Sequence, residues 1–271
     1  MNKILLTTMI SFCSLHTFAN GYMNENMIIF SSESDGSNNP WQGKPKCIPV
    51  IKNGESTKTW SVQYTYLDHT PLTSKYLTTQ KPSTKPVECE HQIHFPDGIQ
   101  DSGIFESFYP NGKPRSRIEY TDGTYNGDLK FWFANGLKEQ ESTVRNGASN
   151  GAYRIWHPNG QLALSMGYKD DMQNGMKQRW YENGEPWTYV RFENNKMVGE
   201  LKQWYRNGKL ERLGAYRDGV RHGTYKTWYA DGTPEAVLNY QAGKIMDAQC
   251  WDESAKSIST KNCISKFSGE D

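Results

Sequence analysis

The feature that most constrains the fold of this chain is a turn dipeptide that recurs every 24 residues. Five copies are Asn-Gly and the sixth is Asp-Gly, beginning at Asn111, Asn135, Asn159, Asn183, Asn207 and Asp231. A second glycine keeps the same step and opens units one to six, at Gly103, Gly127, Gly151, Gly175, Gly199 and Gly223. Self-similarity at a fixed period is typical of repeat architectures, in which a unit buries its apolar face only against its neighbours.

Aromatic columns keep the same register. The residues before each turn are Phe108, Trp132, Trp156, Trp180, Trp204 and Trp228, and beside them run Tyr109, Phe133, His157, Tyr181, Tyr205 and Tyr229. The hydrophobic fraction is only 35%, but aromatic residues make up 13% of the chain. Disordered chains are poor in aromatic residues. We therefore expect a folded protein whose apolar surface is supplied mainly by rings.

The sequence of each unit predicts two strands joined by a turn. Asn-Gly between short aromatic and β-branched runs predicts a hairpin with a type I′ turn, which requires a positive φ at both central residues. A second link, such as residues 122–127 or 218–223, returns the chain into the next unit. The sequence thus predicts an all-β fold, an antiparallel meander of about twelve strands over residues 103–246.

Two faces follow if the two-residue turn sets the register. Phe105 then faces Ile118 and Tyr109 faces Pro114, so one face is apolar and forms the core. The other face carries the Trp column beside Lys and Arg residues. In this register Trp180 opposes Trp187. In three other units Trp132, Trp204 and Trp228 oppose Glu139, Glu211 and Glu235.

Rings and cations on a sheet face are typical of a binding surface, because Trp and Arg dominate interaction hot spots. The candidate partner-binding residues are Trp132, Trp156, Trp180, Trp187, Trp204, Trp228, Lys130, Arg154, Lys202 and Lys226. The alternative is that a column repeated in every unit solves a packing problem. Residues that break the columns are then the better functional candidates, namely His157, Trp187, Arg191 and Arg212.

The repeat unit resembles a known family. Its pattern G-x-Y-x-x-W-Y-x-N-G, followed by Y-x-D-G-x-x-x-G as around Gly223 to Gly243, is similar to the bacterial variant of the MORN repeat. Units three and four depart from it at Asp171 and Asn195, where a turn glycine is missing, and His157 replaces an aromatic residue. Asp and Asn tolerate the left-handed conformation.

The resemblance implies an antitoxin or immunity protein that binds and neutralises a toxin in the bacterial envelope. The alternative is an envelope scaffold or a module that binds lipid or glycan. The balance of 31 basic and 30 acidic residues argues against a nucleic-acid partner and weakens contact with an anionic membrane surface. The oligomeric state stays open.

The first 19 residues read as a secretory signal peptide that is cut after Ala19, so we expect a periplasmic or secreted protein. The rival reading, a membrane anchor, needs about 20 apolar residues. Four cysteines remain after cleavage, Cys47, Cys89, Cys250 and Cys263. An even number in an exported chain implies disulfides, with three possible pairings. Chain order favours the first with the second and the third with the fourth.

Catalysis finds little support, because no nucleophile elbow, phosphate loop or HExxH motif occurs. The best metal candidates are His91 and His94 with Glu88 and Glu90, but residues three apart on a strand point to opposite faces. His222 lies in a link between units and is expected to be a turn residue. We predict a non-enzyme without metal or cofactor.

The flanks form two further regions. Residues 20–102 are expected to be partly loop, with a strand at 60–67, a loop at 74–88 and an edge strand near 89–98. Residues 247–271 are expected to cap the array, with a last hairpin over 247–263.

Overall fold

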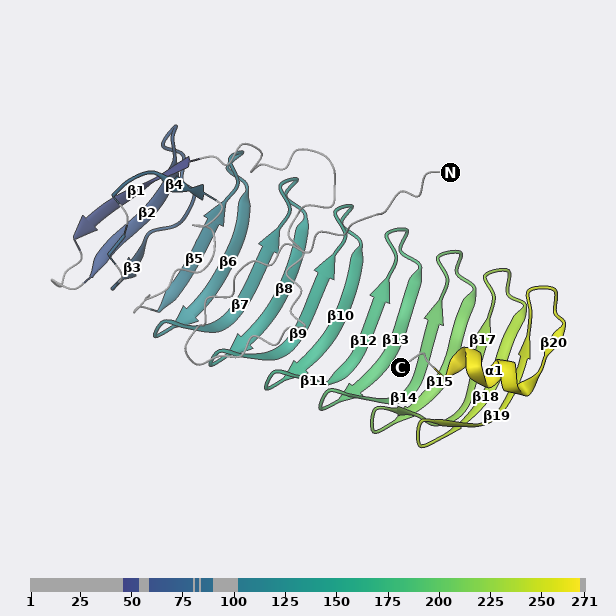
Figure 1. The fold of residues 1–271 in the computed structure, drawn as a ribbon. Coiled ribbons are helices and arrows are strands. Elements are labelled where there is room, and N and C mark those ends of the chain that lie inside the picture. The colour runs from purple at the N-terminus through teal and green to yellow at the C-terminus, as the bar shows by residue number, and fades with distance from the viewer. Residues whose placement is uncertain (1–45, 54–58, 80, 83, 90–101, 269–271) are drawn as a thin grey trace.

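The structure, a computed structural model, describes residues 46–53, 59–79, 81–82, 84–89 and 102–268. The predicted signal peptide, the edge strand predicted near 89–98 and the metal candidates His91, His94 and Glu90 lie outside these residues. The described part consists of a small sheet, a long sheet and one helix (Figure 1).

The long sheet confirms the predicted all-β antiparallel meander, in which each strand pairs with its neighbours in sequence. Its strands are β5 (Gly103–Phe108), β6 (Pro114–Thr121), β7 (Thr124–Trp132), β8 (Lys138–Arg145), β9 (Ala148–Trp156), β10 (Leu162–Lys169), β11 (Met172–Gln173), β12 (Gly175–Trp180), β13 (Pro186–Glu193), β14 (Lys196–Trp204), β15 (Leu210–Arg217), β16 (Val220–Arg221), β17 (Gly223–Trp228), β18 (Pro234–Gln241), β19 (Lys244–Trp251) and β20 (Ser257–Ile258). The sheet therefore runs on beyond residue 246. The short β11 and β16 are followed by Asn174 and His222, whose N–H groups donate to the carbonyls of Gly167 and Ala215.

The type I′ turn predicted at the Asn-Gly link is wrong. At the first link only the glycine has a positive φ, 75° at Gly112, and its N–H donates to the carbonyl of Tyr109 at 2.9 Å. This is a type I turn followed by a left-handed glycine, which inserts a bulge. The type I′ turn occurs at the second link, where Asp122 and Gly123 have φ values of 47° and 72°.

This turn moves the register by one residue at the end of each hairpin, and a second bulge restores the predicted register, at Arg115 in the first hairpin. Phe105 pairs with Ile118 as predicted, but Pro114 pairs with Phe108 and not with Tyr109. The same shift recurs at the other five Asn-Gly or Asp-Gly turns.

The asparagine column has a second role that the turn chemistry did not indicate. The Asn111 Oδ1 accepts the N–H of Lys113, and its Nδ2 donates to the carbonyl of Ala134 in the next unit at 3.1 Å. The inter-unit bond recurs at Asn135, Asn159, Asn183 and Asn207. Each turn is thereby tied to the next along one edge of the sheet.

The two missing turn glycines are replaced by side-chain bonds. Asp171 and Asn195 keep a positive φ, at 62° and 66°. The Asp171 carboxylate accepts the N–H of Ser149, and the Asn195 Oδ1 accepts that of Gln173, both at 2.7 Å. These bonds stabilise the left-handed conformation that glycine adopts without cost.

The tyrosine column beside the turns also forms a ladder between units. The Tyr205 hydroxyl donates to the carbonyl of Trp228 at 2.7 Å, and Tyr109, Tyr181 and Tyr229 make the same bond one unit on. In unit three the His157 Nε2 lies 2.9 Å from the carbonyl of Trp180, which can only accept, so this nitrogen carries the proton. His157 therefore replaces a tyrosine hydroxyl in the ladder.

Removing one rung should lower stability. We expect Tyr205→Phe to lower the free energy of unfolding by about 1 kcal/mol, because the Trp228 carbonyl loses a donor. Phe133 occupies the rung without a hydroxyl, so Phe133→Tyr should raise stability by up to about 1 kcal/mol. Denaturant unfolding of both variants checks the signs; equal midpoints for the wild type and both variants would contradict the ladder.

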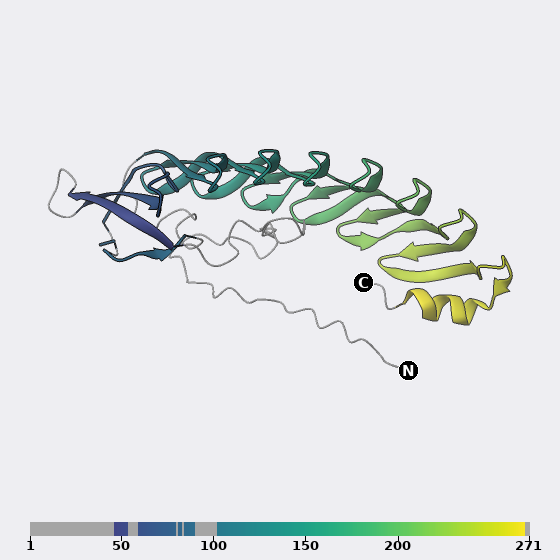
Figure 2. The same cartoon turned by 90° about the horizontal axis from the view of Figure 1, so that it is seen from above.

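The core lies on one face of the long sheet, here called the core face, which bears Phe105, Leu129, Tyr153, Leu201 and Tyr225. The small sheet, β1 (Lys46–Asn53), β2 (Trp60–Tyr66), β3 (Tyr76–Thr78) and β4 (Val87–Glu88), packs its buried side chains with those of β5 to β8. At the other end α1 (Thr260–Phe267) packs on β19. Figure 2 shows the sheet bowed, with α1 on its inner side.

The disulfides join Cys47 to Cys89 and Cys250 to Cys263, the pairing that chain order favoured. The predicted strand at 60–67 is confirmed as β2, but the predicted loop at 74–88 contains β3 and β4. The predicted last hairpin is only partly right. β19 pairs with β20, and the chain then forms α1, whose N-terminus is capped by the Ser259 side chain.

Candidate binding surface

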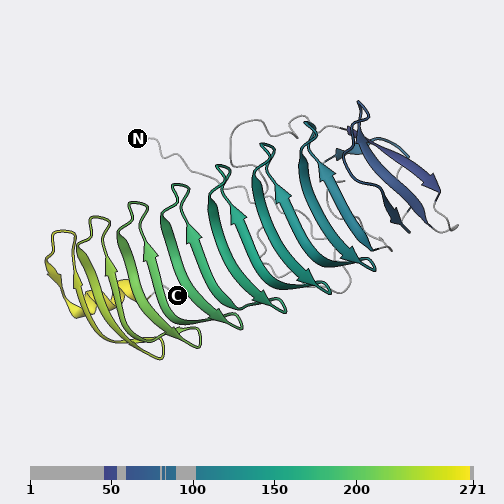
Figure 3. The ribbon, with the colours of Figure 1, turned by 180° about the vertical axis from the view of Figure 1, so that it is seen from behind.

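The second face of the long sheet, here called the Trp face, is the side away from α1, which Figure 3 views. The alternation along the strands places the Trp column on this face. Along four of the strands before a turn, the Trp and a cation two residues earlier alternate with core residues, as Lys130 and Trp132 alternate with Leu129. The rings are half-buried. The Lys138 ammonium lies 5.2 Å from the centre of the Trp156 ring. The Trp face is therefore a row of partly exposed rings, one from each of units two to six.

The cations beside this row are not all free. Lys130 pairs with Asp128 at 2.9 Å, and Lys202 pairs with Glu200 at 2.6 Å. Both pairs lie near the surface, so they contribute little stability but neutralise the local charge. Within the described residues Arg154 and Lys226 are exposed and form no ion pair. The predicted stripe of positive charge is thus reduced to these two positions.

Trp187 lies on the core face, which corrects the predicted register. Trp180 pairs with Pro186 and not with Trp187. The bulge turns Trp187 to the other side, where its ring stacks on Tyr181 with centroids 5.4 Å apart. The Arg179 guanidinium lies over the same ring at 4.3 Å.

Glu139, Glu211 and Glu235 occupy the position of Trp187 in other units. Their predicted pairing with Trp residues is therefore wrong too. Glu211 accepts from Gln203 at 3.0 Å, and Glu235 pairs with Lys266 of α1 at 2.6 Å. Glu139 is the bulged residue beside the Trp132–Lys138 pair. The column therefore faces the inner side of the bowed sheet.

Glu139 is a weaker acid than an exposed glutamate. Burial raises the pKa of its carboxyl from 4.5 to about 7, although the charge of Arg115 lowers that pKa. A carboxyl whose pKa is higher in the folded than in the unfolded state stabilises the fold only below its unfolded pKa. Its contribution is lost as the pH rises from about 4.5 to about 7.

The expected consequence is a pH-dependent difference between the wild type and Glu139→Gln. The two proteins should be equally stable near pH 4.5, whereas at pH 8 the variant should be more stable by about 1–2 kcal/mol. Urea unfolding at the two pH values measures this difference. A variant that is equally stabilised at both values would show that ionisation is not the cause.

Two of the column-breaking residues have partners. Arg191 is exposed on the Trp face and pairs with Glu193 at 3.3 Å. Arg212 lies on the core face, because it pairs with Thr227, which is 3% exposed, and its guanidinium contacts Glu211 at 3.3 Å.

The sequence reasoning missed Lys177 and Arg179 in unit four. They interrupt core columns that read Phe105, Leu129, Tyr153, Leu201 and Tyr225, and Ser107, Phe131, Ile155, Gln203 and Thr227. Comparing these columns, without any structure, would have singled them out.

Four segments of the chain match the MORN repeat variant family. They are residues 102–122, 149–170, 197–218 and 221–242. No curated protein matches the chain. The stretch from 171 to 196, between two of these MORN segments, is not matched and contains Lys177 and Arg179.

No group of three His, Cys, Asp or Glu side chains in the described part of the chain could hold a metal ion. A cavity of about 250 Å³ lies between the last MORN repeat and α1, lined by Arg221, Tyr240, Ile245, Ile264 and Phe267 among others. None of its described lining residues is His, Asp or Glu. No helix among the described residues is long and apolar enough to span a membrane.

Proposed function

We propose that the protein is a non-catalytic binding module that recognises a protein partner through the Trp face of its repeat array. The observation that carries this proposal is the row of half-buried Trp rings, repeated from unit two to unit six. Strands in a sheet lie about 4.8 Å apart, so rings two strands apart repeat at about 10 Å. Such a row offers large contact area at low cost in side-chain entropy.

The partner that we propose is a toxin, neutralised in the envelope or outside the cell. Two disulfides support a non-reducing compartment, where such a complex would form. The MORN repeat variant supports a repeat module. A membrane-binding role is less well supported, because Lys130 and Lys202 are already paired with carboxylates.

The test is direct binding to a purified toxin encoded beside this gene, followed by a variant. We expect Trp204→Ala with Lys202→Glu to weaken the complex at least tenfold, because the first change removes a ring and the second reverses a charge at the contact. Since both positions are on the sheet surface, the folded fraction should stay unchanged by circular dichroism.

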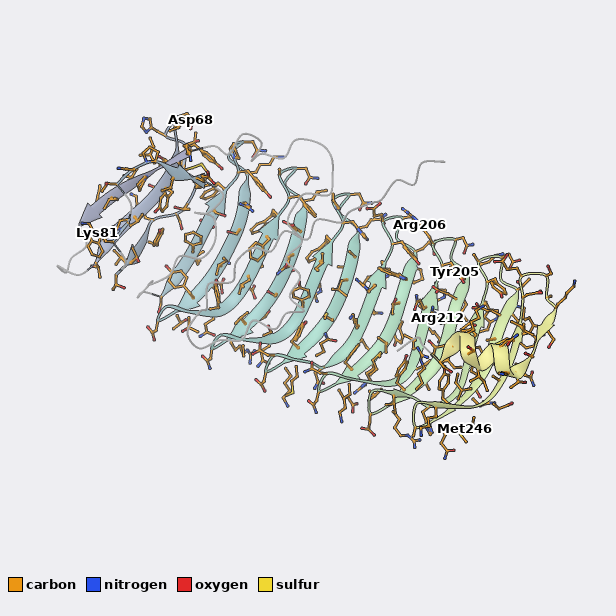
Figure 4. All side chains as sticks on the ribbon, viewed as in Figure 1. Asp68, Lys81, Tyr205, Arg206, Arg212 and Met246 are labelled. Carbon is orange, nitrogen blue, oxygen red and sulfur yellow. A yellow bond between two sulfur atoms is a disulfide. The ribbon has the colours of Figure 1, made fainter. Side chains whose placement is uncertain are left out.

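The matched control is Met246→Ser, a change at an exposed side chain that lies far from Tyr205, the neighbour of Trp204 in sequence (Figure 4). It should bind as the wild type does. If the purified chain binds no such toxin, and deletion of its gene leaves cells equally resistant, the proposed function is wrong.

A further inference from the structure

Unit four carries two cations where every other unit carries a neutral side chain. Lys177 and Arg179 lie in β12 and pair with Val190 and Thr188 of β13. Val190 is 3% exposed and belongs to the core, so both cations are on the core face. A repeat array solves the same packing problem in each unit. Two adjacent departures in one strand therefore require an explanation other than packing.

Aromatic rings hold both side chains. The Arg179 guanidinium lies 4.3 Å from the centre of the Trp187 ring, which itself stacks on Tyr181. The Lys177 ammonium lies 5.5 Å from the centre of Phe192. Cations over ring faces are stabilised and restricted in motion. The site is thus ordered before any ligand arrives, which lowers the entropic cost of binding.

Neither cation has a counter-ion in the part of the chain that the structure describes. Two cations on this side of the sheet do have one, since Arg212 of β15 contacts Glu211 and Lys266 of α1 contacts Glu235. Among the described residues no carboxylate pairs with Lys177 or Arg179. Burial lowers the pKa of both, and Arg179 lowers that of Lys177 further. A half-buried charge without a partner is costly, and an anionic ligand would offset that cost.

The position of unit four agrees with a role in binding. The small sheet packs with β5 to β8, and α1 packs at β19, so neither lies over β12 (Figures 1 and 2). The two cations therefore lie on the inner side of the bowed sheet, between its two covered ends.

We propose that Lys177 and Arg179 form a binding site for an extended acidic segment of a partner protein. The cations are two residues apart on one strand, so their Cα atoms are separated by about 6.6 Å. An extended segment with acidic residues at alternate positions repeats this spacing and places one carboxylate on each cation. Trp187 and Phe192 provide apolar surface for the stems of such side chains. The site is on the opposite face from the Trp column, so it stands independently of the proposed function.

The test is isothermal titration of the full mature chain at low ionic strength with three probes. The first is an eight-residue peptide with glutamate at alternate positions, the second is the same peptide with glutamine, and the third is inorganic phosphate. The key variant is Lys177→Leu with Arg179→Gln, because it installs the residues that unit five has at these positions, Leu201 and Gln203. The control Lys226→Gln removes a cation from the Trp face.

We expect the wild type and the control to bind the glutamate peptide at least tenfold more tightly than the double variant does. The glutamine peptide and phosphate should bind at least tenfold more weakly than the glutamate peptide. The double variant should melt no lower than the wild type, because it removes two half-buried charges that no described carboxylate neutralises. Equal binding by the double variant, equal binding of phosphate, or a melting temperature several degrees lower would each overturn the proposal.

Discussion

Gly214→Leu is expected to lower the free energy of unfolding by about 3 kcal/mol or more, because it places a large side chain where the next strand leaves no room. A Cβ at this position would lie 1.9 Å from the Tyr225 ring of the next strand. Tyr225 is 3% exposed and belongs to the C-terminal core cluster, so its ring has little room to move. Urea unfolding of the purified variant measures the loss.

The repeat itself provides the rescue. A large ring on the first strand of a unit faces a small residue on the preceding strand, as Tyr153 faces Ser142. A larger residue on the preceding strand faces a side chain smaller than tyrosine, as Ile118 faces Leu129. Adding Tyr225→Leu to Gly214→Leu should therefore restore more than half of the lost stability. If the double variant is no more stable than Gly214→Leu alone, the volumes of facing side chains do not compensate as the columns indicate.

Removing the disulfide between Cys250 and Cys263 is expected to cost about 3 kcal/mol, the value for a loop of this size. The two sulfur atoms are buried and attach α1 to β19. A helix of eight residues is not stable alone in water. We therefore expect α1 to detach when both cysteines are replaced by alanine.

Hydrogen exchange measures this effect locally. The amides of residues 260–267 should exchange much faster in the double alanine variant, and exposure of the last strands should promote association. Replacing Cys47 and Cys89 by alanine is the matched control, since it should destabilise the other end of the array and leave α1 protected. If α1 remained protected without its own disulfide, helix packing alone would hold the cap.

Most of the fold could be predicted from the sequence alone. Gly103 and its five equivalents, with the aromatic columns in the same register, were enough to predict the meander and its two faces. The turns were predicted at the right places but with the wrong types, because Asn-Gly serves both a type I′ turn and a type I turn with a left-handed glycine. That difference is one residue, and one residue moved Trp187 and Glu139 to the other face.

The site was harder to predict for two physical reasons. Charged residues in a strand are usually assigned to the solvated face, so the sequence did not single out Lys177 and Arg179 as site residues. Only the observed strand register places them on the core face. The roles of Asn111 and His157 depend on bonds to the next unit, 23 residues on. Such bonds are not visible in local turn chemistry, although the constancy of the columns was a signal of them.

The measurement that tests the proposed function most directly is a stoichiometric titration of toxin activity with the purified chain. A binding module neutralises its target by occupying it, so activity should fall linearly and reach zero near one chain per toxin molecule. Inactivation at a small fraction of that ratio would indicate turnover and an enzyme. No loss of activity at a large excess of the chain would contradict the account.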